Sequence, residues 1–162
     1  MKENMAVQVI KLVVSVAICQ FAGYVGSIFT SQSIPTWYAS LSKPSFTPPN
    51  WVFAPVWMTL FVLMGISAYL VWHQGLQNAL VKRALIIFLI QLVLNVFWSF
   101  LFFKFRSPSY AFVEITGLWI AIALTIVAFS RVSRPAAFLL IPYIVWVSFA
   151  AVLNLAIARL NR

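Results

Sequence analysis

The sequence predicts an all-α integral membrane protein, a bundle of five transmembrane helices with a long structured loop between helices one and two. Composition is the first observation, because 64% of the 162 residues are hydrophobic and only 8% are charged. A soluble domain would have about a quarter of its residues charged. The second observation is that five apolar stretches are long enough to cross about 30 Å of hydrocarbon. We therefore treat residues 1–162 as a single membrane domain.

The five predicted helices are separated by short polar or proline-containing segments, except after the first helix. They cover residues 6–29, 51–72, 80–103, 110–130 and 135–158. Short connections favour antiparallel packing of helices that are consecutive in the chain. Pro142 lies inside the last predicted helix and should bend it, because proline removes a backbone hydrogen bond.

The first apolar stretch has an alternative interpretation as a cleaved signal peptide. Lys2 and Lys11 precede or enter the apolar core, as in a signal sequence, but the run is longer than an ordinary signal-peptide core. We therefore predict an uncleaved helix. Four small residues near its end would let another helix approach closely: Ala22, Gly23, Gly26 and Ser27.

The formal net charge is +9, from 11 Lys and Arg against 2 Asp and Glu. In membrane proteins such an excess usually lies at helix ends, beside anionic lipid headgroups. The basic residues occur singly or in pairs, without the basic stripe that is typical of nucleic-acid-binding proteins. We therefore expect membrane lipids as partners and no nucleic acid. The basic residues divide almost evenly between the two sides, so the orientation stays open.

Residues 30–50 form the predicted loop. Pro44, Pro48 and Pro49 exclude a continuous helix here, because each fixes its own φ and lacks a backbone donor. Long ordered loops are usually functional. We expect this loop to fold over one end of the bundle as a lid and to help form the wall of a ligand pocket. Its candidate ligand-binding residues, with those just after it, are Trp37, Tyr38, Lys43, Pro44, Trp51 and Trp57.

One face of the third helix carries polar and aromatic residues at helical spacing. They are Gln91, Asn95, Trp98, Ser99 and Phe102. Amide and hydroxyl groups in hydrocarbon need partners, so this face should point into the bundle. For Gln91 we favour hydrogen bonding between helices. For Asn95 and Trp98, ligand contact and helix packing both remain open.

The fifth helix carries a tryptophan in the middle of its span. Trp146 lies away from either membrane interface, so its indole N–H needs a buried partner. The predicted bend and the small side chain of Ala150 would leave space beside it, and Tyr143 lies on the same side. A pocket wall and plain helix packing explain this face equally well.

Few side chains in the sequence could support catalysis or metal binding. Glu114 is the one acid within a predicted span and is a candidate functional residue, although water or Arg106 could also satisfy it. Paired carboxylates, His/Cys clusters and nucleophile–base pairs are lacking. His73 is expected to be structural at the interface, with haem ligation as the alternative, and Cys19 to be a small buried residue. No metal and no cofactor are predicted.

Three stretches carry recognisable motifs. Residues 37–57 read Trp-Tyr-x-x-Leu-x-Lys-Pro-x-Phe-x-Pro-Pro-x-Trp-x-Phe-x-Pro-Val-Trp. Residues 91–99 read Gln-Leu-x-Leu-Asn-x-x-Trp-Ser, and residues 140–154 read Leu-Ile-Pro-Tyr-x-x-Trp-x-x-Phe-Ala-x-x-Leu-Asn. Together these motifs resemble the TspO/MBR family of translocator and tryptophan-rich sensory proteins, and they extend over nearly the whole chain.

The resemblance implies a five-helix bundle, often a homodimer, in a bacterial-type cell membrane. It implies binding of porphyrins, including haem as a ligand rather than a cofactor, of sterols and of synthetic benzodiazepine-site ligands, in a pocket closed by the first loop. The family's ligand contacts would fall on Tyr38, Trp57, Asn95, Trp98, Ser99, Phe102 and Trp146. Trp57 and Trp146 would also be the catalytic residues if the protein degraded porphyrins in light, as reported for some bacterial members.

Two positions depart from the family pattern. Phe46 stands where the family tends to have tryptophan, and residues 152–159 lack the tyrosine of the sterol-recognition motif of animal members. A sterol is therefore a less favoured natural ligand than a tetrapyrrole. Three functions remain in competition: a membrane receptor or transporter for tetrapyrroles, with a role in tetrapyrrole handling or stress sensing; a light-dependent porphyrin-degrading enzyme; and a structural or stress-sensing membrane partner.

Overall fold

The computed structural model describes residues 4–161, and within this range it contains helices and turns but no strand. The elements are α1 (Met5–Ser33), η1 (Ile34–Tyr38), α2 (Asn50–Trp72), α3 (Ala79–Ser99), η2 (Phe100–Lys104), α4 (Pro108–Ser130), α5 (Arg134–Leu139) and α6 (Ile141–Leu160). Among the described residues, five helical spans are long and apolar enough to cross a membrane. The predicted fold class is therefore confirmed.

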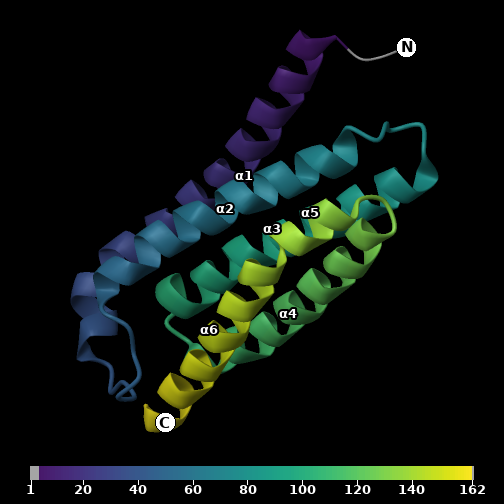
Figure 1. Ribbon diagram of the computed structural model, residues 1–162. Coiled ribbons are helices and arrows are strands. Elements are labelled where there is room, and N and C mark those ends of the chain that lie inside the picture. Colours follow the sequence, from purple (N-terminus) through teal and green to yellow (C-terminus); the bar gives the residue numbers. More distant parts are fainter. Residues whose placement is uncertain (1–3, 162) are drawn as a thin grey trace.

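The helices pack side by side along the bundle (Figure 1), and their contacts place them in a ring in which chain order and spatial order differ. Helix α1 packs on α2 and α3, α4 packs on α3 and α6, and α2 packs on α5 as well as on α1. The order around the ring is therefore α1, α2, α5–α6, α4, α3. Helices α2 and α3 are consecutive in the chain but contact each other much less than they contact these partners. Short connections set their antiparallel directions, whereas side-chain packing decides which helices adjoin.

The first span is longer than predicted. Residues 30–40 are helical and continue α1 through the π-helix η1, so the predicted loop over residues 30–50 is wrong in its first half. Pro35 lies at the second position of η1, where a widened turn accommodates a residue that cannot donate the usual helical hydrogen bond. The irregular connection is residues 41–49, and it contains the three prolines that were expected to exclude a helix.

This short connection lies against the end of α6. The backbone N–H of Ser42 donates to Asn161 Oδ1 at 2.9 Å, and Asn161 Nδ2 donates back to the Ser42 carbonyl at 2.9 Å. The ring of Phe46 contacts Phe149, with 6.4 Å between centroids. Figure 1 shows the connection beside the C-terminal end of α6. The connection thus covers one end of the bundle, as predicted.

Pro142 was expected to bend the last helix, and the structure shows a break there instead. Helix α5 ends at Leu139, and α6 begins at Ile141 with the proline in its first turn. The short α5 is held by α2, because Ser67 Oγ donates to the carbonyl oxygen of Ala136 at 2.7 Å. The bounds of spans two to five differ from the predicted bounds by at most two residues.

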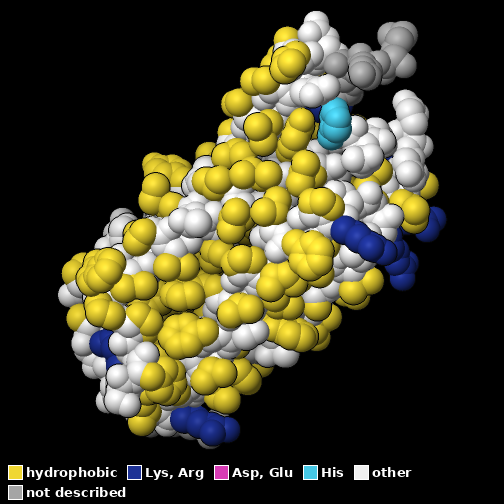
Figure 2. All heavy atoms as spheres, in the orientation of Figure 1, with side chains coloured by type: hydrophobic (Ala, Val, Ile, Leu, Met, Phe, Trp, Pro, Cys, Tyr) yellow, Lys and Arg dark blue, Asp and Glu magenta, His cyan; other side chains and the backbone are white. Residues whose placement is uncertain are grey.

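Apolar side chains cover the outside of the bundle as well as its core. Between α3 and α4, Phe88 stacks on Phe129 with 5.6 Å between ring centroids. On the outside, Phe21, Val93 and Val113 are each about two-thirds exposed, and Figure 2 shows hydrophobic side chains spread over the face in view. A surface with so many exposed apolar side chains would promote aggregation in water, whereas it is well suited to contact with lipid chains.

Candidate functional site

The ring of helices encloses a cavity of about 470 Å³. Its lining comes from α1, η1, α2, α3, η2 and α6, and no described residue of α4 or α5 contributes. The volume lies within the range of about 300–1,000 Å³ that is usual for small-molecule sites, which are mostly apolar with a few polar groups. This cavity is the candidate ligand-binding site.

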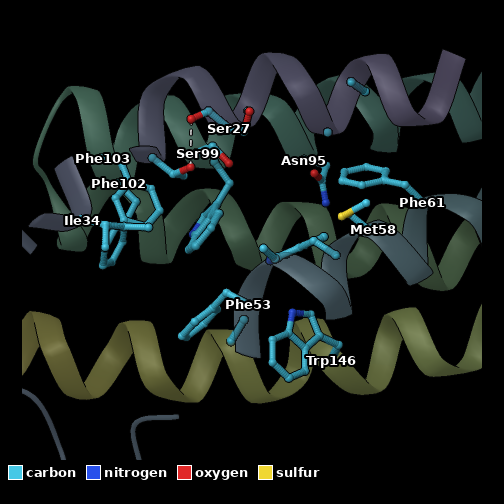
Figure 3. Close-up of a pocket in the computed structure, with 18 of the residues that line it drawn as sticks. Ser27, Ile34, Phe53, Met58, Phe61, Asn95, Ser99, Phe102, Phe103 and Trp146 are labelled. Carbon is cyan, nitrogen blue, oxygen red and sulfur yellow. Dashed lines mark hydrogen bonds between the residues drawn. The ribbon is translucent and has the colours of Figure 1, made fainter. Parts of the chain in front are cut away.

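Aromatic rings from α2 and α6 form one part of the wall. Trp57 stacks on Phe61, with ring centroids 5.6 Å apart and planes inclined by 30°. Phe53 meets Trp146 edge to face, with centroids 6.0 Å apart. In Figure 3, Phe53 and Trp146 lie across the cavity from Asn95 and Ser99. The site therefore presents flat apolar surfaces on opposing elements.

The end of the cavity nearest the 41–49 connection is also aromatic. Trp98 stacks on Phe102, with ring centroids 5.3 Å apart. Tyr38 tilts against Phe102 and Phe103 at 6.2 and 5.8 Å. Tyr38 belongs to η1, while Phe102 and Phe103 belong to η2, so both π-helical segments line the site. Such segments are frequent at functional sites, and sequence periodicity gave no indication of them.

A hydrogen-bonded chain supports the polar side of the cavity. Asn95 Nδ2 donates to the hydroxyl of Tyr143 at 2.9 Å, and this hydroxyl donates to Gln91 Oε1 at 2.9 Å. Gln91 therefore bonds between helices, as predicted, and Tyr143 lies behind the cavity wall. Asn95 lines the cavity, and its side-chain oxygen accepts no hydrogen bond from the described residues. One acceptor is thus left at the cavity surface.

The two tryptophans on facing helices differ in their hydrogen bonding. Trp98 donates its indole N–H to Asn154 Oδ1 at 3.0 Å, so this donor is already used. The indole N–H of Trp146 was expected to have a buried hydrogen-bond partner. This prediction is wrong, because the buried Nε1 has no acceptor among residues 4–161. Leaving a buried donor unpaired costs about 1–3 kcal/mol. The indole N–H of Trp146 is therefore an unused donor in the wall of the site.

Eight of the residues predicted to bind ligand line the cavity. They are Tyr38, Trp57, Asn95, Trp98, Ser99, Phe102, Trp146 and Ala150. Two more pack behind this lining: Tyr143, through its hydroxyl, and Trp37, whose ring meets Phe102 edge to face at 5.7 Å. The structure thus brings together residues that are more than a hundred positions apart in the chain.

The other predicted residues do not line the cavity. Trp51 is 74% exposed, on the outside of α2. Lys43 lies over the ring of Tyr38, with Nζ 4.8 Å from its centroid, and donates to the carbonyl oxygens of Ala39 and Leu41. Pro44 lies in the 41–49 connection, none of whose residues lines the cavity. The expected loop wall is formed instead by η1, because the chain stays helical as far as Ser40.

The titratable candidates also lie outside the cavity lining. Both carboxyl oxygens of Glu114 are buried without a hydrogen-bond partner among residues 4–161, so Arg106 does not satisfy this side chain. Cys19 is buried in the helix core, as expected. His73 follows the last residue of α2, at the opposite end of that helix from Asn50, which lines the cavity. Among the described residues, no three His, Cys, Asp or Glu side chains gather into a metal site.

Apart from Trp57, sequence reasoning missed the part of the lining that α1 and α2 provide. From α1 come Gln20, Gly23, Tyr24, Ser27 and Thr30, and from α2 come Asn50, Phe53, Ala54, Met58 and Phe61. The small residues of α1 were a usable signal, because they predict close approach. A Cβ on Gly23 would lie 2.6 Å from the ring of Phe61, and one on Gly26 would lie 3.3 Å from Ser99 Oγ.

Five apolar helical spans that surround a cavity with aromatic walls define a multi-pass membrane protein of the helical-bundle class. Residues 15–160 match the TspO/MBR family, and the chain belongs to this family. It is 44% identical over 154 residues to the tryptophan-rich protein TspO of Chlorobaculum tepidum, covering 95% of this chain and 98% of that protein.

Two further relatives come from other domains of life. The chain is 46% identical over 153 residues to the tryptophan-rich protein TspO of Archaeoglobus fulgidus, covering 94% of this chain and 98% of that protein. It is 40% identical over 141 residues to the translocator protein of Homo sapiens, covering 85% and 82%. The suspected family membership is therefore confirmed.

Proposed function

We propose that this protein is a membrane receptor or carrier that binds porphyrins and other flat hydrophobic molecules in the cavity between its helices. The observation that carries the proposal is a space of about 470 Å³ walled by aromatic rings on four helices. A flat macrocycle can stack on such rings while its apolar edges remain in hydrocarbon. Two relatives are named translocator protein and tryptophan-rich sensory protein. These names are consistent with transport and sensing, and both activities need a bound ligand.

Two unused polar groups suit the centre and the edge of such a ligand. The oxygen of Asn95 is a free acceptor, matched to a pyrrole N–H of a metal-free porphyrin. The unpaired indole N–H of Trp146 is matched to an acceptor on the ligand, which would recover the cost of leaving that donor unpaired. Stacking would supply most of the affinity and these two groups the orientation.

A cation lies next to the aromatic end of the site. Lys43 is half-buried, with Nζ against the outer face of Tyr38, whose ring lines the cavity. A ligand carboxylate that extends past Tyr38 would therefore meet a positive charge near the membrane surface. The carboxylates of a porphyrin lie at one edge of the macrocycle, so we propose that this edge faces η1.

The macrocycle is proposed to bind without iron coordination by histidine or cysteine. Neither Cys19 nor His73 lines the cavity, so neither is placed to reach the centre of a bound ring. Haem added to the protein should give an absorption spectrum without histidine or cysteine ligation. A spectrum with either ligand would overturn this part of the proposal.

Titration of the purified protein in lipid nanodiscs with protoporphyrin IX tests the proposal directly. Saturable quenching of tryptophan fluorescence is expected, since Trp57, Trp98 and Trp146 line the site. Asn95→Leu should weaken binding about tenfold, because the loss of one hydrogen bond worth about 1.4 kcal/mol lowers the affinity by that factor. The matched control is Trp51→Phe on the exposed face of α2, which should leave the affinity unchanged. Quenching that does not saturate would overturn the proposal.

A second candidate function is light-dependent degradation of the bound porphyrin, with dissolved dioxygen as the oxidant. It is favoured by one observation, that Trp57 and Trp146 both line the cavity where a macrocycle would lie. The titration should therefore be repeated in light and in darkness with product analysis. Loss of porphyrin in light that requires the protein would support this function.

We also propose, from the family resemblance, a homodimer in a bacterial-type cell membrane. The exposed side of α4 offers an apolar contact surface that includes Val113 and Ile120, and a Cβ on Gly117 beside them would meet nothing within 4 Å. Cross-linking of the protein in its native membrane, with Gly117→Trp as a disruptive variant, would test this. A monomer at all protein-to-lipid ratios would contradict it.

A further inference from the structure

The cavity is lined by exposed residues on one side and by covered residues on the other. Its exposed lining residues are Tyr24, Ser27, Asn50, Ala54 and Met58, all on α1 or α2. Every described lining residue on α3, η2 and α6 is buried or half-buried. The cavity therefore opens to the outside of the bundle through the gap between α1 and α2.

This gap begins where the two helices separate. Near the middle of α1 the two backbones touch, because a Cβ on Gly65 would lie 2.5 Å from Cα of Val16. One helical turn further along α1, Gln20 Nε2 donates to the carbonyl oxygen of Met58 at 3.0 Å. Beyond this bond, no hydrogen bond joins residues 21–33 of α1 to α2. The Gln20–Met58 bond is therefore the last hydrogen bond between the two helices, and beyond it they touch through Gly23 and the ring of Phe61.

The opening faces lipid chains. Met58 is eight residues into α2, so it lies about 12 Å along the axis of a helix that is long and apolar enough to span a membrane. Around the opening, the outer faces of α1 and α2 carry the exposed apolar side chains of Phe21, Ile28 and Val62. A gap framed by such side chains favours entry of apolar molecules from the bilayer.

At the end of the cavity nearest the 41–49 connection, the aromatic lining of η1 and η2 is covered, while Asn50 at the start of α2 is exposed on the side of the gap. Phe102 and Phe103 are nearly fully buried there, and Tyr38 is only 5% exposed. The paired hydrogen bonds between Ser42 and Asn161 hold the connection against α6 outside these rings. A ligand arriving from water at this end would have to displace both layers.

We infer that the site exchanges its ligand sideways with the bilayer, through the gap between α1 and α2, and not with water beneath the 41–49 connection. Tyr24 and Met58 frame the gap, and the Gln20–Met58 hydrogen bond restrains it. The inference rests on the proposed ligand binding and specifies its ligand class: flat molecules that dissolve in the membrane. Porphyrins with two carboxylates belong to this class, and porphyrins with eight do not.

Two cross-links with opposite expected effects test the route. On a Cys19→Ala background, Tyr24→Cys with Met58→Cys, joined by a short bis-maleimide, bridges the gap. The matched control, Ser42→Cys with Asn161→Cys, fixes the 41–49 connection where the two residues are already hydrogen-bonded. Stopped-flow fluorescence measures binding and release of protoporphyrin IX in nanodiscs. Bridging the gap should slow both rates at least tenfold, and fixing the connection should change them less than twofold.

A pair of single substitutions gives the same test without a cross-link. Gln20→Leu removes the hydrogen bond at the edge of the gap and should speed both association and release several-fold. The control, Thr59→Val, lies outside the cavity lining and loses only a hydroxyl bond to Pro55 of its own helix, so the rates should stay unchanged.

Each outcome decides between the two proposals. If the unmodified protein binds protoporphyrin IX, and neither the bridged gap nor Gln20→Leu changes the association and release rates, the sideways route alone is overturned. Slowing by the fixed connection would assign exchange to the water side. Absence of saturable binding by the unmodified protein would overturn ligand binding itself, and the route with it. Equal affinity for two-carboxylate and eight-carboxylate porphyrins would contradict the proposed ligand class.

Discussion

The indole N–H of Trp98 on α3 donates to Asn154 Oδ1 on α6 at 3.0 Å, and this bond joins two walls of the cavity. The amide of Asn154 also donates to the carbonyl oxygen of Pro108 at the start of α4, at 2.7 Å. One asparagine therefore ties three helices together at the aromatic end of the site. With its N–H held in this way, Trp98 can offer a ligand its ring face but not its donor.

Removing this asparagine should destabilise the bundle. Asn154→Leu leaves the N–H of Trp98 and the carbonyl of Pro108 without partners, and each unpaired buried group costs about 1–3 kcal/mol. Unfolding in mixed detergent micelles measures the loss. The control is Thr116→Val, which removes a hydroxyl bonded only to the carbonyl of Phe112 in its own helix and should change stability by less than about 0.5 kcal/mol. Equal stability of the two variants would count against the role of Asn154.

Substitution of the unpaired tryptophan should separate stability from binding. Trp146→Phe removes a buried donor without a partner, so the free energy of unfolding should fall by less than for Asn154→Leu, although ring volume is lost. Affinity for protoporphyrin IX should nevertheless fall about tenfold if the ligand uses this N–H, as one hydrogen bond of about 1.4 kcal/mol implies. Fluorescence titration and detergent unfolding of the same samples give both values. Unchanged affinity would remove Trp146 from the proposed contacts.

The two cavity tryptophans together test the enzymatic alternative. In a Trp57→Phe, Trp146→Phe protein both rings that line the site remain aromatic, so stacking and measurable porphyrin binding should persist. Light-dependent loss of porphyrin should disappear if indole chemistry is required. The readout is the absorbance of bound porphyrin under illumination, with a dark sample alongside. Degradation at the rate of the unsubstituted protein would rule out these residues as catalytic.

Two glycines should respond to alanine with opposite signs. Gly65→Ala places a Cβ 2.5 Å from Cα of Val16, so α1 must move away from α2, at a cost of about 1–3 kcal/mol or more. Gly117→Ala meets nothing within 4 Å and should stabilise α4 by about 0.5–1 kcal/mol, the usual gain for alanine within a helix. Unfolding measurements on both variants check this pair. A stabilising Gly65→Ala would contradict the backbone contact.

Much of the site could be predicted because its residues carry their own local signals. An amide such as Asn95 or an indole such as Trp146 in the middle of an apolar span has few reasons to face lipid, and both line the cavity. The prediction for Trp51 rested on its place in a motif, and its side chain faces outward, since nothing in the motif specifies which side of α2 it occupies. The sequence did not indicate that Met58 and Gln20 line the cavity, because such side chains also occur on membrane helices that line no cavity.

The sequence by itself determined the five spans, the proline-rich break between the first two and an irregularity at Pro142, which was predicted as a bend and is a break between α5 and α6. These follow from hydropathy and from the missing donor of proline, which act within a few residues. Only the tertiary structure decided that α2 adjoins α5, that Ile34–Tyr38 stays helical, and that the cavity opens between α1 and α2. Those features depend on which side chains meet across helices, and that choice is made when the whole ring packs.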